Sequence, residues 1–321
     1  MTTEIFPKIP NNEIKQQEET VQKSEQKWLI EHIIKPELPK IIETLGHCLD
    51  VITSKDIIKL PISSNRTEQV KGIVSRSSSE LIDLDIKLHL KTLNRKIHLK
   101  LQSPIELVQI TKIIGMITEL IGEIEILKQF DLNDINGFLD QLRKILKNLS
   151  DCNNTLNKPH ESILFPQHGI NLSETFDTLA TGQNLSQFQD KLTIDFFILN
   201  TEISIEFKSL EKITESPWNE IDSNGISHVD KLREGLKNHT IKLNDILDRD
   251  KRKLGHVFGL NKFSTNDYLT RSITFNNSVV IEVEKLLIHC QDPNLISIGA
   301  KLNGLEHLTS KMFKNLELSL M

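Results

Sequence analysis

The chain has 321 residues, of which 38% are apolar and 26% charged, and its formal net charge is −5. That balance argues against a general nucleic-acid binder, because such proteins carry a basic excess. Three isolated cysteines, Cys48, Cys152 and Cys290, argue against a disulfide framework and favour a reducing compartment. The N-terminus lacks the apolar core of a secretory signal. The sequence also has no run of about 18 uncharged apolar residues, so it predicts no membrane span.

The first segments are predicted to be a flexible tail and a helix. Residues 1–20 are polar and charged, which favours the tail. From about Glu25, apolar residues recur at alternating steps of three and four: Ile34, Leu38, Ile42, Leu45, Leu49 and Ile52. Pro36 and Pro39 lie inside this pattern. Because a proline in a helix interior costs about 3 kcal/mol, we expect a kink or a restart there.

The period then changes to the alternation that is typical of strands. Gln69–Ser75 is a predicted strand, with Gly72 as a possible bulge. In the next segment the apolar residues occupy every second position: Ile82, Leu84, Ile86, Leu88 and Leu90. The same alternation returns at Ile97, Leu99 and Leu101 after a polar turn near Asn94, so the pair predicts a hairpin.

The strongest helix signal covers residues 103–129. Its apolar seam consists of six residues: Leu107, Ile110, Ile114, Ile117, Ile121 and Ile124. Ser103 is the predicted N-cap, with Glu106 as the acid of a capping box. Gly115 and Gly122 lie on the back of the seam, where they indicate either a close approach to another element or a tolerated weakness of the helix.

The rest of the chain alternates between helical and strand patterns. A second helix has its apolar face at Ile135, Leu139, Leu142, Leu146 and Leu149. A second hairpin turns at Asn200, residues 211–267 form a charged and partly helical segment, and a strand pattern returns at 273–289. The last helix begins at Asp292-Pro293 and has these residues on its seam: Leu295, Ile298, Leu302, Leu305, Thr309, Met312 and Leu316.

These elements predict an α+β fold, in which an antiparallel β domain is inserted between the helices of an antiparallel bundle. The bundle comprises 21–54, 103–150 and 291–321, and the β domain comprises 55–102 and 188–290. Burying the six side chains of one seam stabilises a helix by roughly 10 kcal/mol. Ordering the backbone of a helix of about 25 residues costs more free energy than that. The helices must therefore share a core. Short links favour an intramolecular bundle over a coiled coil between chains.

Motifs for catalysis or cofactor binding are missing from the sequence. It contains no phosphate-binding Gly-x-x-x-x-Gly-Lys-Ser/Thr loop, no Gly-x-Ser-x-Gly elbow and no Glu-x-x-His pair, so we predict no enzyme and no cofactor. Four residues share the polar face of the first hairpin and could hold a metal: Asp83, Asp85, His89 and His98. A solvated sheet face is the favoured interpretation. The basic cluster Arg249–Lys253 could touch an anionic membrane, but a solvated loop is favoured.

In the order of its elements and in several short strings, the chain resembles the Rogdi family, whose fungal members are called RAVE subunit 2. The string Gln69-Val70-Lys71-Gly72 is the most specific match, and Trp28-Leu29-Ile30 and Asp85-Ile86-Lys87-Leu88 also fit. The similarity covers about 25–150, 162–210 and 271–316, whereas 211–267 looks like an insertion.

The resemblance implies a non-catalytic adaptor in a RAVE-like complex that promotes assembly of the V-ATPase. The implied partners are a large β-propeller-containing subunit, the Skp adaptor and V-ATPase peripheral-sector subunits, with no nucleic acid. The implied location is cytoplasmic, with recruitment to the vacuolar or endosomal membrane surface through the complex. Gln69, Val70, Lys71 and Gly72 are candidate partner-binding residues, although a purely structural role fits this strand equally well. The alternatives are a coiled-coil tether of membrane trafficking, which would form elongated homo-oligomers, and an uncharacterised enzyme.

Overall fold

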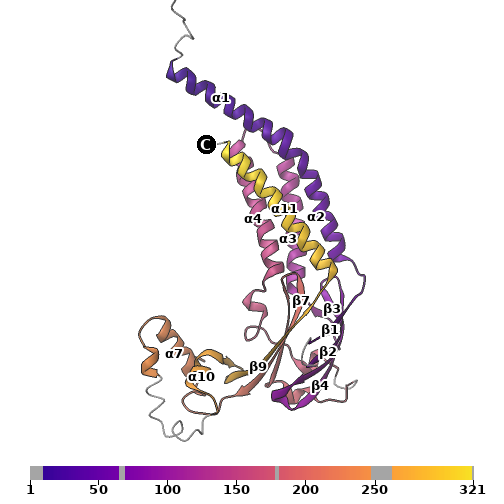
Figure 1. Cartoon of the computed structure of the whole chain (residues 1–321), viewed down its shortest axis with the longest axis vertical. Helices are drawn as coiled ribbons and strands as arrows, with labels where there is room; N and C mark the ends of the chain where they lie inside the picture. The colour runs from indigo at the N-terminus through magenta and orange to yellow at the C-terminus, as the bar shows by residue number, and fades with distance from the viewer. Residues whose placement is uncertain (1–9, 65–68, 178–180, 247–261, 320–321) are drawn as a thin grey trace, which may run out of the picture.

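A computed structural model describes residues 10–64, 69–177, 181–246 and 262–319. A helical bundle occupies one end of the molecule and two antiparallel sheets occupy the other (Figure 1). This arrangement confirms the predicted fold class, with the sheets inserted between the helices along the chain. The predicted basic cluster Arg249–Lys253 lies outside the described residues.

Four helices close the bundle on itself: α2 (Leu38–Thr53), α3 (Val108–Lys128), α4 (Ile135–Asn157) and α11 (Pro293–Leu318). Contacts join α2 to α3, α3 to α4, α4 to α11, and α11 back to α2. All seven predicted seam residues of α11 are buried. The seams therefore meet within one chain, as the short links predicted.

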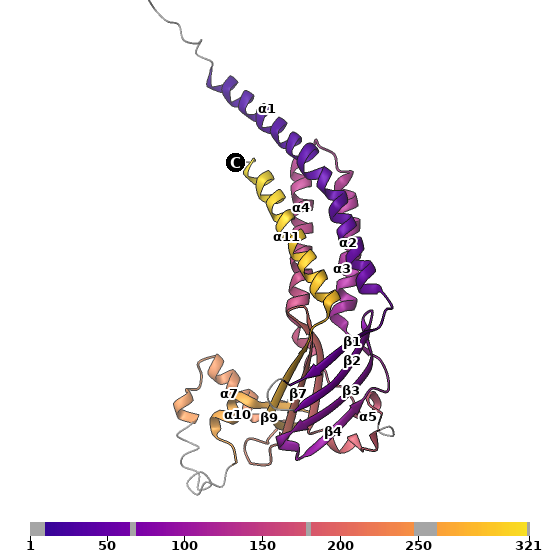
Figure 2. The same ribbon diagram turned by 45° about the vertical axis from the view of Figure 1, so that its right-hand side comes forward.

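The predicted interruption near Pro36 is present. Helix α1 (Asn11–Leu29) passes through a π-helical turn at Ile30–Ile34 and a 3-10 turn at Lys35–Glu37 before α2 begins. Figure 2 shows α1 extending beyond the end of the bundle, where the Nε2 atoms of Gln22 and Gln26 each donate to the Ser319 carbonyl at 2.8 Å.

The predicted tail over 1–20 is wrong for residues 11–20, which are helical. These residues are polar, but many are Glu, Gln and Lys, which lose little side-chain freedom in a helix. Polarity alone therefore did not indicate a flexible segment. Residues 1–9 lie outside the described part of the chain.

Helix α3 begins later than predicted, and the capping box at Ser103 is wrong. Ile105–Glu106 forms a short strand, β5, which pairs with Leu81 and Glu80 of β3. That pairing holds the backbone extended, so the helix starts at Val108 without a side-chain cap. On the helix, Ile113 and Leu120 take the seam positions predicted for Ile114 and Ile121, which are partly buried. The fully buried seam residues are Ile110, Ile113, Ile117, Leu120, Ile124 and Leu127.

Gly115 and Gly122 face solvent, and no described atom lies within 4 Å of a Cβ built at either position. The glycines therefore mark tolerated weakness of the helix and not a close approach to another element.

Replacing Gly115 or Gly122 with alanine should raise the free energy of unfolding by about 1 kcal/mol, because alanine loses less backbone freedom on folding. Chemical denaturation would measure this gain. Gly299→Ala in α11 is the matched control and should destabilise, since its Cβ would lie 2.4 Å from Thr201 Cγ2.

Thr309 is the one polar residue on the α11 seam, and its side chain is 1% exposed. Its Oγ1 has no hydrogen-bond partner among the described residues. A buried hydroxyl without a partner carries a desolvation cost of about 1–3 kcal/mol.

Thr309→Val, which keeps the shape of the side chain and removes the hydroxyl, should therefore raise the unfolding midpoint in denaturant. Thr309→Ser, which keeps the hydroxyl and removes the methyl group, should lower it.

Both predicted hairpins are present. The first sheet has the order β1-β2-β3-β4, formed by Ile58–Ser63, Val70–Ser77, Glu80–Leu90 and Arg95–Lys100. The second has the order β6-β7-β9-β8, formed by Leu192–Leu199, Glu202–Lys212, Ser278–Cys290 and Ser272–Phe275. Asn200 and Thr201 turn the second hairpin with φ of 50° and 62°, the left-handed conformation that two-residue hairpin loops require.

The register between β2 and β3 shifts at Ser75 and Arg76, where Ile82 of β3 is the extra residue, and not at Gly72 as predicted. Gly72 pairs regularly with Ile86. A Cβ built there would lie 2.1 Å from the Asp85 carbonyl oxygen, so the position needs glycine for close backbone approach.

One continuous apolar core runs from the bundle seams to the facing sides of both sheets. The predicted boundaries between bundle and β domain stay a prediction, because this shared core does not mark them. A second, smaller cluster belongs to the predicted insertion and the strands beside it: Ile213, Trp218, Val229, Ile246, Tyr268, Leu269, Val279 and Ile281.

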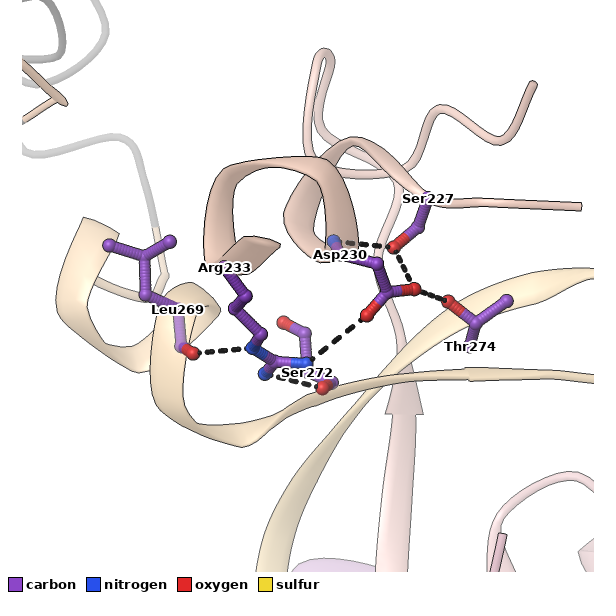
Figure 3. A network of polar contacts seen from close by, with 6 residues as sticks. All are labelled: Ser227, Asp230, Arg233, Leu269, Ser272 and Thr274. Carbon is purple, nitrogen blue, oxygen red and sulfur yellow. Dashed lines mark hydrogen bonds and ion pairs between the residues drawn. The ribbon is translucent and has the colours of Figure 1, made fainter. Parts of the chain in front are cut away.

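Polar contacts hold helices α7 (His228–Lys237) and α10 (Thr265–Arg271) against β8 (Figure 3). The Asp230 carboxylate accepts from Ser227 Oγ at 2.6 Å and from Thr274 Oγ1 at 2.7 Å. Burial would raise the pKa of Asp230, but these hydrogen bonds and the Arg233 charge lower it overall. Arg233 also donates to the carbonyls of Leu269 and Ser272. The described residues of α7 and α10 therefore pack with β8 as one unit.

Candidate partner-binding surface

The outer face of the first sheet carries polar side chains in register across the strands. The inner face packs on the core, and alternation along each strand leaves the other side chains outside. Four strands supply the outward-facing lysines, which are Lys59, Lys71, Lys87, Lys96 and Lys100. Lys71 of β2 lies directly opposite Lys87 of β3, which in turn lies opposite His98 of β4.

The four candidate residues differ in what they can offer a partner. Val70 is fully buried in the core. Gly72 has no side chain to offer, because the Asp85 carbonyl lies too close to leave room for one. The Gln69 Nε2 atom donates to Glu284 Oε1 of β9 at 2.9 Å and so joins the two sheets. Lys71 is exposed. Of the four side chains, Lys71 is therefore the one that is best placed for a partner, and the partner-binding role of the string stays a prediction.

Glu284 anchors the contact between the sheets. Burial would raise the pKa of this carboxylate, but hydrogen bonds from Thr92 and Gln69 lower it overall. Thr92 donates to Glu284 Oε2 through its backbone N–H at 3.0 Å and through Oγ1 at 2.9 Å. Gln69 and Glu284 are 215 positions apart in the chain, so sequence periodicity gave no signal for this contact.

The four residues considered for a metal share the outer face but do not converge. His98 Nε2 lies 2.8 Å from Asp85 Oδ1, and both side chains are partly exposed. Among the described residues, no group of three His, Cys, Asp or Glu side chains could hold a metal ion.

A buried ion pair joins this sheet to the start of the bundle's last helix. Arg76 lies two positions after Val74 on the inner face of β2, and its Nε lies 2.5 Å from Asp292 Oδ2. The two side chains are 1% and 0% exposed. The other carboxylate oxygen of Asp292 accepts from the N–H groups of Asn294 and Leu295 and so caps α11. The sequence predicted the helix start, but the partner of its cap is 216 residues away.

The second sheet holds a buried charge network. Lys208 Nζ lies 2.6 Å from Glu206 Oε2 and 3.0 Å from Asp195 Oδ2, and Lys285 lies 2.6 Å from Glu206 Oε1. Burial raises the pKa of Asp195, even though Lys208 and the Phe165 N–H work in the opposite direction. Burial also opposes the charged form of Glu206, but its hydrogen bonds to Lys208 and Lys285 lower its pKa overall.

Comparison with protein families matches residues 25–317 to the family described as Rogdi leucine zipper containing protein. The chain belongs to the Rogdi family. This confirms the resemblance seen in the sequence strings. The match also spans the charged segment 211–267, which therefore lies within the region that the Rogdi family describes.

A relative of this Rogdi-family chain in Saccharomyces cerevisiae is named regulator of V-ATPase in vacuolar membrane protein 2. The two are 29% identical over 309 residues, and the alignment covers 87% of this chain and 86% of the relative. In the part of the chain that the structure describes, no helix is long and apolar enough to cross a membrane.

Proposed function

We propose that this Rogdi-family chain is a non-catalytic adaptor of a RAVE-like complex that promotes assembly of the V-ATPase from its peripheral and membrane sectors. The observation that carries the proposal is the similarity, over most of both chains, to a relative named as a V-ATPase regulator of the vacuolar membrane. The proposed partners are a large β-propeller-containing subunit, the Skp adaptor and subunits of the peripheral sector. The complex would bring the chain from the cytoplasm to the vacuolar or endosomal membrane.

The fold supports an adaptor that works through its outer surfaces. The apolar seams of the four helices pack against one another within the chain. The core is therefore complete without a partner protein. The outer face of the first sheet is charged and exposed. A body with one shared core can position two partners by binding each of them at a different face.

Purification of the tagged full-length chain from its own cells tests the partners. We expect the propeller subunit, the Skp adaptor and peripheral-sector subunits to be recovered together. Deleting the chain should also lower the amount of peripheral sector on isolated vacuolar membranes, with the membrane sector unchanged. Recovery of neither the propeller subunit nor any V-ATPase subunit would refute the proposal.

Size-exclusion chromatography with light scattering separates the proposal from a tethering function. A coiled-coil tether requires an elongated homo-oligomer, since its seams must pair between chains. The adaptor requires a monomer in isolation, because its seams pair internally. An elongated dimer with seams exchanged between chains would favour the tether.

A further inference from the structure

The outer face of the first sheet concentrates positive charge on a chain whose net charge is negative. It carries five lysines against two aspartates, Asp83 and Asp85, and Asp85 already pairs with His98. Within the described residues, no carboxylate lies within ion-pair distance of Lys71, Lys87 or Lys96. Like charges directly opposite each other on neighbouring strands destabilise a sheet. An anionic ligand would relieve the repulsion between Lys71 and Lys87.

The same lysines line a hollow at one end of this face. Its walls are formed by Ser63 and Val70, by Lys71 and Lys87, and by Leu88, His89 and Lys96. The His89 Nδ1 atom is buried and has no hydrogen-bond partner among the described residues. Three ammonium groups and a hydroxyl are all able to donate hydrogen bonds. The hollow therefore suits a carboxylate or another anion.

The neighbouring row of the face holds an exposed apolar pair, Pro61 and Ile73, with Asp85 on the other side of Ile73. Ile73 is 50% exposed, lies two residues from Lys71 along β2, and pairs across the ladder with Pro61. Two residues of an extended strand span about 6.8 Å, and an extended peptide repeats its own side chains at the same interval. A free phosphate could bind the lysines but would leave Ile73 unused. A flat anionic membrane would also meet Asp83 and Asp85, which are exposed on the same face and would repel it.

We propose that this face binds an extended acidic protein segment. One carboxylate of the segment would lie between Lys71, Lys87 and Lys96, and an apolar side chain two positions away would cover Ile73. The inference depends on the charges and register of the sheet and is independent of the proposed function, so either can fail without the other.

Fluorescence anisotropy with the full chain and a labelled peptide of three Glu-Ser-Leu-Ser repeats tests the inference. The peptide should bind, with an affinity that falls as salt rises, because exposed charges are screened. The double variant Lys71→Glu/Lys87→Glu should weaken binding by about tenfold or more, which corresponds to about 1.4 kcal/mol. Ile73→Ser should weaken it by a smaller factor. A peptide with Gln in place of Glu should not bind.

The matched control is Lys147→Glu/Lys314→Glu, which changes the net charge equally at exposed positions on the bundle. It should bind the peptide like the parent chain, and equal losses in both double variants would overturn the proposal. Thermal unfolding of each variant must match the parent. Two further arms use inorganic phosphate as a competitor and vesicles of phosphatidylserine and phosphatidylcholine. Vesicle binding that depends on Lys71 and Lys87, without peptide binding, would assign the face to a membrane and overturn the proposal.

Discussion

Arg76→Met should lower the free energy of unfolding by about 3–5 kcal/mol, one of the two largest effects expected in this chain. The substitution keeps most of the side-chain volume but leaves the Asp292 carboxylate fully buried without its cation. It also removes the hydrogen bond from Arg76 to the Ser78 carbonyl beside the bulge. Equilibrium denaturation in urea would measure the loss. Arg143→Met is the control and should change stability little, because its partner Asp140 and Arg143 itself are exposed.

A second substitution tests whether the buried charge is the cause. Asn at position 292 can still cap α11 through its side-chain oxygen but carries no charge. Arg76→Met/Asp292→Asn should therefore be more stable than Arg76→Met alone. If the double variant loses as much as the sum of the two single variants, the residues are not coupled and the interpretation is wrong.

Lys208→Met should cost a similar amount at pH 7, about 3–5 kcal/mol, because it leaves buried Asp195 without its cation and removes one of the two cations beside Glu206. Asp195 and Glu206 are 1% and 5% exposed, and Lys285 would remain as a cation beside Glu206 alone. Denaturation of the variant and the parent at matched pH values would measure the difference. Lys147→Met, at an exposed position, should leave stability unchanged.

The pH dependence of this difference has a defined sign. In the parent chain the pKa of Glu206 is lowered, so its contribution to stability is present above its unfolded pKa of about 4.3 and is lost as the pH falls through the folded value. Burial already raises the pKa of Asp195 in the parent, and without Lys208 that pKa should rise further. Glu206 would keep only Lys285 against burial, so its pKa should rise as well, and both changes favour protonation on folding. The deficit of Lys208→Met should therefore shrink as the pH falls from 7 toward 5. A deficit that is constant with pH would indicate lost packing and not lost charge.

The period of apolar residues predicted the elements that bury a single face. It failed where the local conformation depends on pairing with a segment elsewhere in the chain. The α11 seam was predicted residue by residue, since one stripe of the helix faces the bundle. The start of α3 was misplaced because residues 105 and 106 pair with β3 and not with the helix that follows them. Gly72 was read as a bulge, whereas the constraint comes from the backbone at Asp85 on the next strand.

The candidate surface was predictable only in part. Alternation placed Asp83, Asp85 and His89 on one face of a strand, and the structure agrees. The pairing of Lys71 with Lys87 depends on the register between β2 and β3, which the turn at Ser78 helps to set and which the strand pattern does not specify. The string that best matched the Rogdi family therefore contains three residues with structural roles and one that is free to bind.

The bundle takes its last wall from the final helix of the chain, and this has a consequence during synthesis. At roughly 5–20 residues per second, the ribosome needs about 10–40 s to reach Asp292 after making Arg76. For that interval α2, α3 and α4 present an incomplete apolar groove, and Arg76 lacks its carboxylate. A nascent chain that is stopped before α11 emerges would expose this groove. We expect chaperones, which bind exposed apolar surface, to bind such a chain. The bundle can therefore close only after α11 has been made and has packed on α2 and α4.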